Sequence, residues 1–370
     1  MAECFASFQA NPASQHREGR RARQRLEDAR ETIAGLLGAE VASHAADRLI
    51  FTSGGTEANN LALLGLAAAA EKHHALPHEA VISSIEHPSI LGPAAHLESR
   101  GWRIHRLRAH SNGEVAADEL PALLNDRTRF ASIMLGNNET GVRQPMDRFA
   151  ALCQQRGVPL HTDAVQVAGR EPLDFRSLDV AAMTVAAHKF NGPLGVGVLL
   201  VRAGVEMEPQ LFGGFQQAAL RPGTESVALA VGMATAFQKF TEEQAERPAR
   251  IRRLRDRFEA ALVAGYPQLV INGRDAERLP GVSNIAFVGL DRQQLFLALD
   301  LAGVCCSTGS ACASGSSEPS TVLKAMGLPA EVVQSSLRFS LGTTTTEPEI
   351  DDAVRRILAA CQTMSARSPS

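Results

Sequence analysis

Short apolar runs alternate with helical patterns from residue 48 to residue 201, and this alternation most constrains the fold. Repeated strand–helix–strand units predict a mostly parallel sheet with helices packed on its faces. The expected strands cover residues 48–52, 80–84, 102–107, 131–136, 160–163, 180–185 and 196–201. The expected helices between them cover residues 57–70, 88–100, 117–124 and 146–156. The sequence therefore predicts an α/β protein with a seven-stranded, mostly parallel sheet.

The second part of the chain mixes helices and strands without regular alternation. Helices are expected at residues 226–246, 248–265, 291–301, 320–326 and 347–364, and strands at residues 282–288, 304–307 and 336–340. This pattern predicts a smaller α+β domain. We expect a large domain of residues 11–245 and a small domain of residues 246–370 that also includes residues 1–10, with the boundary near residues 241–250.

Composition and charge argue against a nucleic-acid partner and a membrane partner. The net charge of the 370 residues is -3, and the Arg-rich helices at 17–30 and 251–257 carry no interleaved aromatic residues. Such helices are typical of solvated faces rather than of nucleic-acid platforms. The longest apolar stretch, residues 61–70, is too short to span a bilayer, and the first residues do not resemble a signal peptide. A cytoplasmic location is expected.

One of the six cysteines stands in an unusual setting. Cys312 lies within residues 307–315, which are otherwise almost all Ser, Gly, Ala and Thr. This composition predicts a mobile, solvent-facing loop, either a plain linker or an arm that delivers a thiol. The cysteines lack the spacing of a disulfide framework or a metal site, so no metal is expected.

Polar residues at the ends of two strands indicate a cofactor. Asp163 and Lys189 each follow an expected strand and lie 26 residues apart. Pyridoxal-phosphate enzymes use a lysine for the Schiff base and a carboxylate at the pyridine nitrogen, although isolated Asp and Lys residues are mostly surface groups. The sequence Gly54-Gly55-Thr56 leads from a strand into a helix and favours a phosphate there, with a simple glycine turn and N-cap as the alternative.

Several motifs together resemble the cysteine desulfurases of the class V aminotransferase group. They lie at residues 51–60, 86–88, 137–139, 161–166, 188–190 and 338–342. The run Ser310-Ala311-Cys312, followed by Glu318-Pro319-Ser320, resembles the long-loop branch, which feeds sulfur to scaffold and carrier proteins. The resemblance runs from Asn11 to about Ala353. It implies the type I fold of pyridoxal-phosphate-dependent transferases.

The resemblance implies how each matching residue would bind pyridoxal 5'-phosphate. Lys189 would form the Schiff base and move the α-proton, and His87 would stack on the ring and assist this transfer. The other ligands would be Asp163 at the pyridinium nitrogen, Gln166 at the phenolic oxygen, and Thr56, His188 and the backbone of Gly55 at the phosphate. Thr224 resembles the residue of a dimer-crossing loop that binds the phosphate of the partner subunit, which implies a homodimer.

The resemblance also implies L-cysteine as substrate. Arg338 would bind the substrate carboxylate as a bidentate fork, with Asn138 as a second donor. Cys312 would take the sulfur as a persulfide, leave L-alanine, and pass the sulfur to an acceptor or scaffold protein, as in iron–sulfur cluster assembly. The acceptor, the pathway and the preference for cysteine or selenocysteine stay open.

The chain departs from the family pattern at four places. Only ten residues precede Asn11, so the family's Asp-Asn-Ala-Thr-like strand is missing, and we expect a start codon assigned too far downstream or a shortened relative. Ala186 replaces a phosphate-binding serine, Gln217 replaces a glutamate and Leu194 replaces a lysine or arginine. Two alternatives stay open: an aminotransferase or lyase that does not use the thiol, and an inactive homologue that acts as a binding partner.

Overall fold

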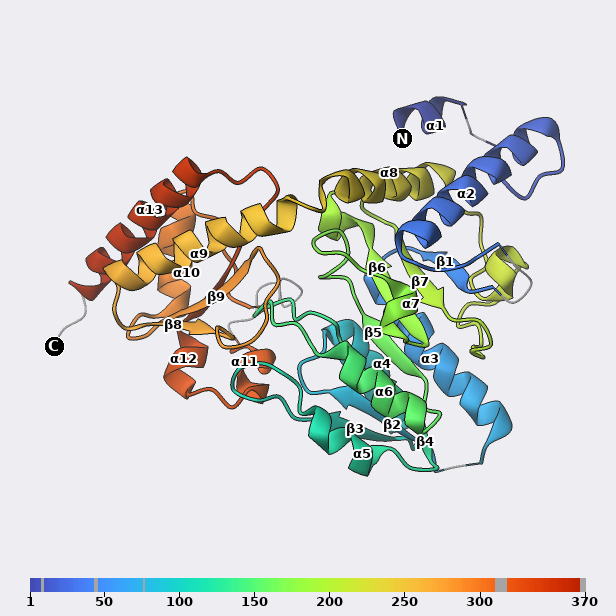
Figure 1. Ribbon diagram of the computed structural model, residues 1–370, viewed down its shortest axis with the longest axis horizontal. Coiled ribbons are helices and arrows are strands. Elements are labelled where there is room, and N and C mark those ends of the chain that lie inside the picture. The colour runs from blue at the N-terminus through green and yellow to red at the C-terminus, as the bar shows by residue number, and fades with distance from the viewer. Residues whose placement is uncertain (8–9, 43–45, 76, 310–317, 367–370) are drawn as a thin grey trace. The chain divides into compact units, whose positions relative to one another are not determined.

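The computed structural model describes residues 1–7, 10–42, 46–75, 77–309 and 318–366, which form two compact units (Figure 1). The first unit comprises Met1–Leu107, Ala117–Leu135 and Pro145–Gln244, and the second comprises Arg108–Ala116, Gly136–Gln144 and Ala245–Ser370.

The beginning of the chain belongs to the first unit, not to the small domain that the sequence predicts. Helix α1 (Ala2–Ser7) packs against α8 (Val227–Glu243). Met1 occupies the space beside Gly232, where a Cβ atom would lie 2.7 Å from the Met1 sulfur. A glycine in α8 therefore makes room for the first residue of the chain.

A seven-stranded sheet forms the centre of the first unit. Its strands are β1 (Arg48–Thr52), β2 (Glu79–Ser83), β3 (Arg103–Leu107), β4 (Thr128–Ser132), β5 (Leu160–Asp163), β6 (Ala182–Ala186) and β7 (Gly197–Val201), in the order β1-β7-β6-β5-β4-β2-β3. Strand β7 runs antiparallel to both neighbours, and the other pairs are parallel. The predicted mostly parallel sheet is confirmed. Strand β4 starts earlier than predicted because its pairing with β2 begins at Thr128.

Helix α3 (Gly55–His73) packs on strands β4, β5, β6 and β7 of this sheet. Its apolar side chains join a buried cluster that includes Leu63, Phe130 and Trp102. Burying a side chain of this size stabilises the fold by roughly 1.5–3 kcal/mol. The remaining helices of the unit are α2 (Arg17–Leu36), α4 (Pro88–Ser99), α5 (Leu120–Leu123), α6 (Met146–Gln155) and α7 (Phe175–Leu178), with 3-10 turns at Ala117–Glu119, Ala187–Phe190 and Gln216–Ala219.

A three-stranded antiparallel sheet organises the second unit. Its strands are β8 (Leu269–Asn272), β9 (Val282–Phe287) and β10 (Ser336–Ser340), in the order β10-β9-β8. The helices described in this unit are α9 (Arg247–Gly265), α10 (Arg292–Leu301), α11 (Thr321–Ala325), α12 (Ala330–Gln334) and α13 (Glu347–Ser365). The predicted strand at residues 304–307 is wrong, because only Ser307 pairs with β10, in a single bridge to Arg338.

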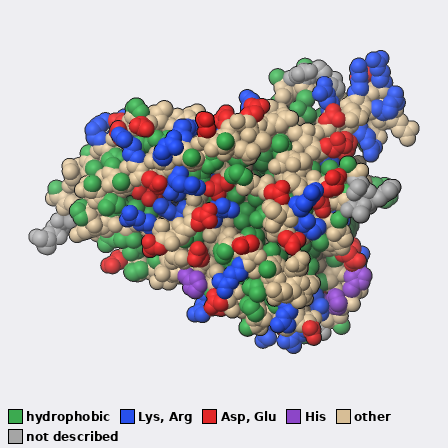
Figure 2. All heavy atoms as spheres, in the orientation of Figure 1, with side chains coloured by type: hydrophobic (Ala, Val, Ile, Leu, Met, Phe, Trp, Pro, Cys, Tyr) green, Lys and Arg blue, Asp and Glu red, His purple; other side chains and the backbone are tan. Residues whose placement is uncertain are grey.

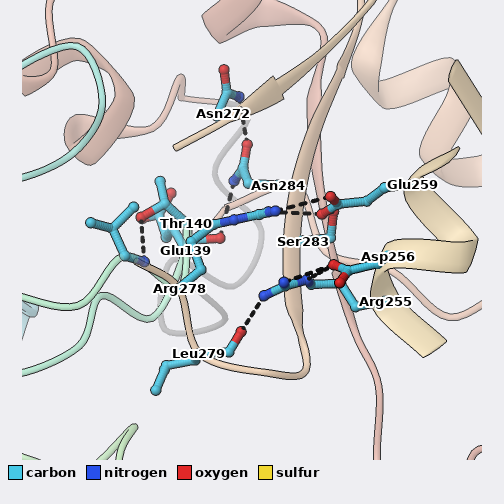
Figure 3. Close-up of polar contacts among 11 residues, drawn as sticks. Glu139, Thr140, Arg255, Asp256, Glu259, Asn272, Arg278, Leu279, Ser283 and Asn284 are labelled. Carbon is cyan, nitrogen blue, oxygen red and sulfur yellow. Dashed lines mark hydrogen bonds and ion pairs between the residues drawn. The ribbon is translucent and has the colours of Figure 1, made fainter. Parts of the chain in front are cut away.

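A buried polar cluster ties the segment 136–144 to this sheet (Figure 3). Arg278 donates two hydrogen bonds, of 2.7 and 2.9 Å, to the carboxylate of Glu259, and its backbone forms a bridge to Val142. Asn284 on β9 donates to the carbonyl of Glu139 over 3.2 Å. These contacts hold Glu139 and the preceding Asn138 in the second unit.

Charged side chains of both signs are interspersed over the face shown in Figure 2. Exposed ion pairs of the described residues include Arg106 with Glu98 and Arg257 with Asp351. Among the described residues, no helix has the length and apolar character needed to cross a bilayer.

Candidate active site

A buried carboxylate marks the carboxyl end of β5. Asp163 is 6% exposed, and its Oδ2 accepts a hydrogen bond of 2.7 Å from the side-chain amide of Asn59 on α3. Its Oδ1 accepts the backbone N–H of Val165 at 2.9 Å. Burial raises the pKa of Asp163, and the two hydrogen bonds oppose that rise. A cation placed against the remaining lone pairs would stabilise the ionised form.

His87 and Lys189 lie within electrostatic reach of this carboxylate. His87 is the N-cap of α4, and its Nδ1 accepts the backbone N–H of Ser89 at 3.1 Å. Burial lowers the pKa of His87, Asp163 opposes this change and Lys189 adds to it. Burial therefore favours the neutral ring, and the acceptor role of Nδ1 assigns its proton to Nε2. Lys189 is half-buried in the 3-10 turn that follows β6.

The first turn of α3 forms an anion cradle. Gly54 is the N-cap, and no side chain among the described residues caps this end. A Cβ atom at Gly55 would lie only 3.0 Å from Val165 Cγ2 and 3.5 Å from the Ala186 Cβ, so the backbone approaches its neighbours closely here. The positive end of the helix dipole and its uncapped N–H groups favour a phosphate.

The other predicted cofactor ligands are exposed or half-buried. Thr56, His188 and Thr224 are exposed, and Gln166 is half-buried in the turn after β5. Burial lowers the pKa of His188, and the neighbouring Lys189 lowers it further.

The hydroxyl of Thr184 does not replace the missing serine at Ala186. Thr184 Oγ1 lies 3.0 Å from His161 Nε2, and His161 Nδ1 lies 2.9 Å from Ser132 Oγ. Burial lowers the pKa of His161 to about 3, so this histidine is a neutral link between β4, β5 and β6. The Thr184 hydroxyl is already committed to that link.

The segment around Thr224 is fixed at two points. The Gln217 side chain pairs with both backbone groups of Phe51 on β1: its Oε1 accepts the N–H at 2.6 Å, and its Nε2 donates to the carbonyl at 2.8 Å. An ionised glutamate could accept but not donate, which explains why glutamine suits this position. Arg221 donates to Glu57 Oε1 over 2.7 Å and so ties the segment to the first turn of α3.

In the second unit, Arg338 lies against Asn138. Its Nη1 donates to the Asn138 carbonyl over 2.9 Å, and its backbone N–H donates to the carbonyl of Ser307 at 2.7 Å. Glu139 is 3% exposed and accepts the hydroxyl of Ser320 at 2.6 Å. Burial raises the pKa of Glu139, and the charges of Arg338 and Arg292 oppose that rise.

His87, Asp163 and Lys189 thus lie in the first unit, and Asn138 and Arg338 in the second. Cys312 lies outside the described residues. The sequence gives no role to Asn59 or Ser89 in the first unit, nor to Glu139, Arg292 or Ser320 in the second. A signal for Asn59 is that it is the one polar residue among the buried positions of α3.

The family model for aminotransferase class-V matches residues 1–352. An IscS-like cysteine desulfurase of Mycobacterium tuberculosis is 41% identical over 361 residues, which cover 95% of this chain and 90% of that protein. A cysteine desulfurase of Nostoc sp. is 38% identical over 366 residues, 99% of this chain and 89% of that protein. Among solved structures, a NifS-like protein matches with a TM-score of 0.89 at 30% identity, covering 98% of this chain and 94% of that one.

These likenesses confirm the predicted type I transferase fold and the predicted resemblance to cysteine desulfurases. The family match spans both units of the structure. The chain belongs to the class-V aminotransferase family.

Proposed function

We propose that this chain is a pyridoxal-phosphate-dependent cysteine desulfurase. It converts L-cysteine to L-alanine and passes the sulfur, carried as a persulfide on Cys312, to an acceptor protein. The observation that carries the proposal is the buried Asp163 carboxylate, which Asn59 holds within electrostatic reach of His87 and Lys189. The names of the relatives support the choice of reaction.

The residues of the first unit fit pyridoxal 5'-phosphate. Asp163 offers a carboxylate whose ionised form needs a cationic partner, and a protonated pyridine nitrogen is such a partner. The uncapped turn at Gly55 and Thr56 suits the phosphate, and His188 would be a further donor to it. Gln166 would donate to the phenolic oxygen. When bound, the cofactor supplies an electron sink for the bonds broken at the substrate's α-carbon.

The side chains divide the remaining work. Lys189 would hold the cofactor covalently and move the proton at the substrate's α-carbon, and the neutral His87 ring would stack on the cofactor and assist this proton transfer. Arg338 would bind the substrate carboxylate through its planar fork, with Asn138 as a second donor.

Cys312 would act as the nucleophile toward sulfur. Its thiolate forms a bond to the substrate sulfur while the Cβ–S bond of the substrate breaks, and Cβ then takes up a proton so that alanine can leave. A thiol of the acceptor protein would take the terminal sulfur and return Cys312 to its thiol form. Iron–sulfur cluster assembly is one process that consumes sulfur delivered in this way.

We also propose a cytoplasmic homodimer. Thr224 is exposed and follows two anchored residues, Gln217 and Arg221, and it would reach the phosphate bound by the partner subunit. The exposed Phe212 and Phe215 on the same segment support burial against a second copy.

The test uses the purified protein loaded with pyridoxal 5'-phosphate, L-cysteine and a reductant. We expect alanine and sulfide in equal amounts, and we expect Lys189→Ala to lose both products and the visible absorbance of the bound cofactor. Arg221→Lys is the control. It keeps a positive charge opposite Glu57 in the first turn of α3, so it shows how far a mild change beside the phosphate site affects the same readouts. Turnover of L-cysteine by Lys189→Ala at the wild-type rate would refute the proposed role of Lys189.

A further inference from the structure

Arg292 bridges the two ends of the segment that carries Cys312. It occupies the first turn of α10 and is 7% exposed. Its Nη1 donates to the carbonyl of Thr308 over 3.1 Å, and its Nη2 donates to the carbonyl of Glu318 over 3.3 Å. Thr308 precedes Cys312 and Glu318 follows it, so one guanidinium joins the chain on both sides of the proposed sulfur nucleophile.

Both ends continue into fixed structure. On one side, Ser307 and Arg338 exchange backbone hydrogen bonds of 2.7 and 3.0 Å, which attach the chain to β10. On the other side, Ser320 caps α11 by accepting the N–H of Leu323 and donates to Glu139 over 2.6 Å. Arg292 lies between two anchored points and connects them directly.

Burying the charged guanidinium of Arg292 costs free energy, which its contacts must offset. A guanidinium that is largely buried needs matched acceptors and a balancing charge, which the two carbonyls and Glu139 supply. A planar fork can donate to two separate carbonyls at once, whereas a lysine ammonium is a single point. An arginine at this position can therefore connect two separate segments of the chain.

We propose that Arg292 is a positioning residue for sulfur transfer: by holding Thr308 and Glu318 together, it sets the two ends of the segment that carries Cys312. The inference rests on the proposed desulfurase function. Without the bridge, the two ends are free to move apart, and a misplacement of a reacting group by about 1 Å can lower a rate about a hundredfold. A less well-placed nucleophile has a lower effective concentration at the substrate.

The experiment compares Arg292→Gln with Arg250→Gln in the full chain loaded with cofactor. Arg250 is a matched control, because it also donates to two backbone carbonyls of the second unit, those of Thr343 and Thr345. Each variant is assayed with L-cysteine, which needs the thiol, and with β-chloro-L-alanine, from which chloride leaves without a thiol nucleophile. Limited proteolysis with subtilisin, a protease of broad specificity that does not require an arginine at the cleavage site, measures how accessible the chain between Thr308 and Glu318 is.

For Arg292→Gln we expect kcat with L-cysteine to fall about tenfold or more while turnover of β-chloro-L-alanine and the cofactor absorbance stay within about twofold of wild type. Cleavage between Thr308 and Glu318 should accelerate about fivefold or more. Arg250→Gln should match wild type in both assays, and Arg292→Lys should fall between wild type and Arg292→Gln. Arg292→Lys also serves as the test variant if Arg292→Gln does not fold.

Three results would refute the positioning role of Arg292. They are equal losses of Arg292→Gln with the two substrates, a wild-type rate of Arg292→Gln with L-cysteine, and a wild-type rate of Arg292→Lys with L-cysteine. Failure of the proposed function has a different signature, because the wild type itself would then form no alanine from L-cysteine. In that case the cleavage rates still decide whether Arg292 holds the two ends together.

Discussion

The side-chain amide of Asn59 donates to Asp163 Oδ2 over 2.7 Å, and the same nitrogen donates to Ser89 Oγ over 2.8 Å. Ser89 Oγ in turn lies 2.7 Å from His87 Nδ1. One amide on α3 therefore links the carboxylate at the end of β5 to the histidine at the start of α4. The groups proposed to bind the nitrogen and the face of the cofactor ring are set by a shared hydrogen-bond chain.

Replacing Asn59 should weaken cofactor binding. Asn59→Ala removes a donor from the buried Asp163 carboxylate, so the pKa of Asp163 should rise further and its ionised form should be less available to a cationic ring nitrogen. A hydrogen bond to a charged group contributes about 1.5–3 kcal/mol, so we expect the affinity for pyridoxal 5'-phosphate to fall about tenfold or more. Equilibrium titration of the apo-protein with the cofactor measures this. The neighbouring Asn60→Ala is the control, because the Asn60 amide donates to the backbone carbonyls of Thr56 and Ser89 and not to Asp163. Equal affinities of both variants would contradict the prediction.

Glu86 should make stability depend on pH. Burial raises its pKa from 4.5 to about 8, and no partner of its Oε2 is found among the described residues. The folded protein therefore keeps a proton that the unfolded chain releases between these values, so wild-type stability should fall as the pH rises through this range. Glu86→Gln removes the ionisation, and its free energy of unfolding should exceed that of wild type by at least about 1 kcal/mol near pH 8 but not near pH 5. Denaturant unfolding at both pH values is the measurement, and a pH-independent difference would refute it.

Gln217→Glu should destabilise the edge of the sheet at neutral pH. The glutamate cannot donate to the Phe51 carbonyl while ionised, and its charge would repel that oxygen. We expect a loss of about 1–3 kcal/mol near pH 7 that shrinks as the carboxyl becomes protonated. Gln216→Glu is the control, because Gln216 Oε1 only accepts, from the N–H of Gly223. Thermal unfolding at two pH values tests the prediction, which fails if the two variants behave alike.

Arg278→Ala should be strongly destabilising. It leaves the buried Glu259 carboxylate with one neutral donor, Ser283, in place of a bidentate ion pair (Figure 3). Breaking a buried pair from one side costs about 3–5 kcal/mol. Arg257→Ala breaks an exposed pair with Asp351 and should leave stability essentially unchanged. Similar midpoints of urea unfolding for the two variants would contradict this account of the second unit.

Much of the first unit is predictable from the sequence because its strands are short, apolar and separated by helical periodicity. Strands β1 and β5 have the bounds that the sequence predicts, and the bounds of β2, β3 and β7 differ by no more than one residue. The second unit is harder to predict. Strand β10 has its predicted bounds, but strand β8 has only four residues, and residues 304–307 are strand-like in sequence but find a pairing partner only at Ser307.

The proposed cofactor and substrate ligands could be predicted from sequence motifs, whereas the residues that hydrogen-bond to them and fix their positions could not. Asn59 meets Asp163 from a position 104 residues away in the chain. Arg292 bonds to Thr308 and Glu318 because both residues lie beside the first turn of α10 in the folded chain. Such partners depend on tertiary packing, and local sequence patterns carry no record of it.

Sulfur placement on Cys312 tests the central claim most directly. The cofactor-loaded protein is mixed with one equivalent of L-cysteine, stopped after a single turnover and digested, and the peptide containing Cys312 is examined by mass spectrometry alongside the alanine released. We expect one additional sulfur atom on Cys312 for each alanine formed, and neither product from Cys312→Ser. Alanine formation by Cys312→Ser at the wild-type rate, or alanine without added sulfur on Cys312, would contradict the account.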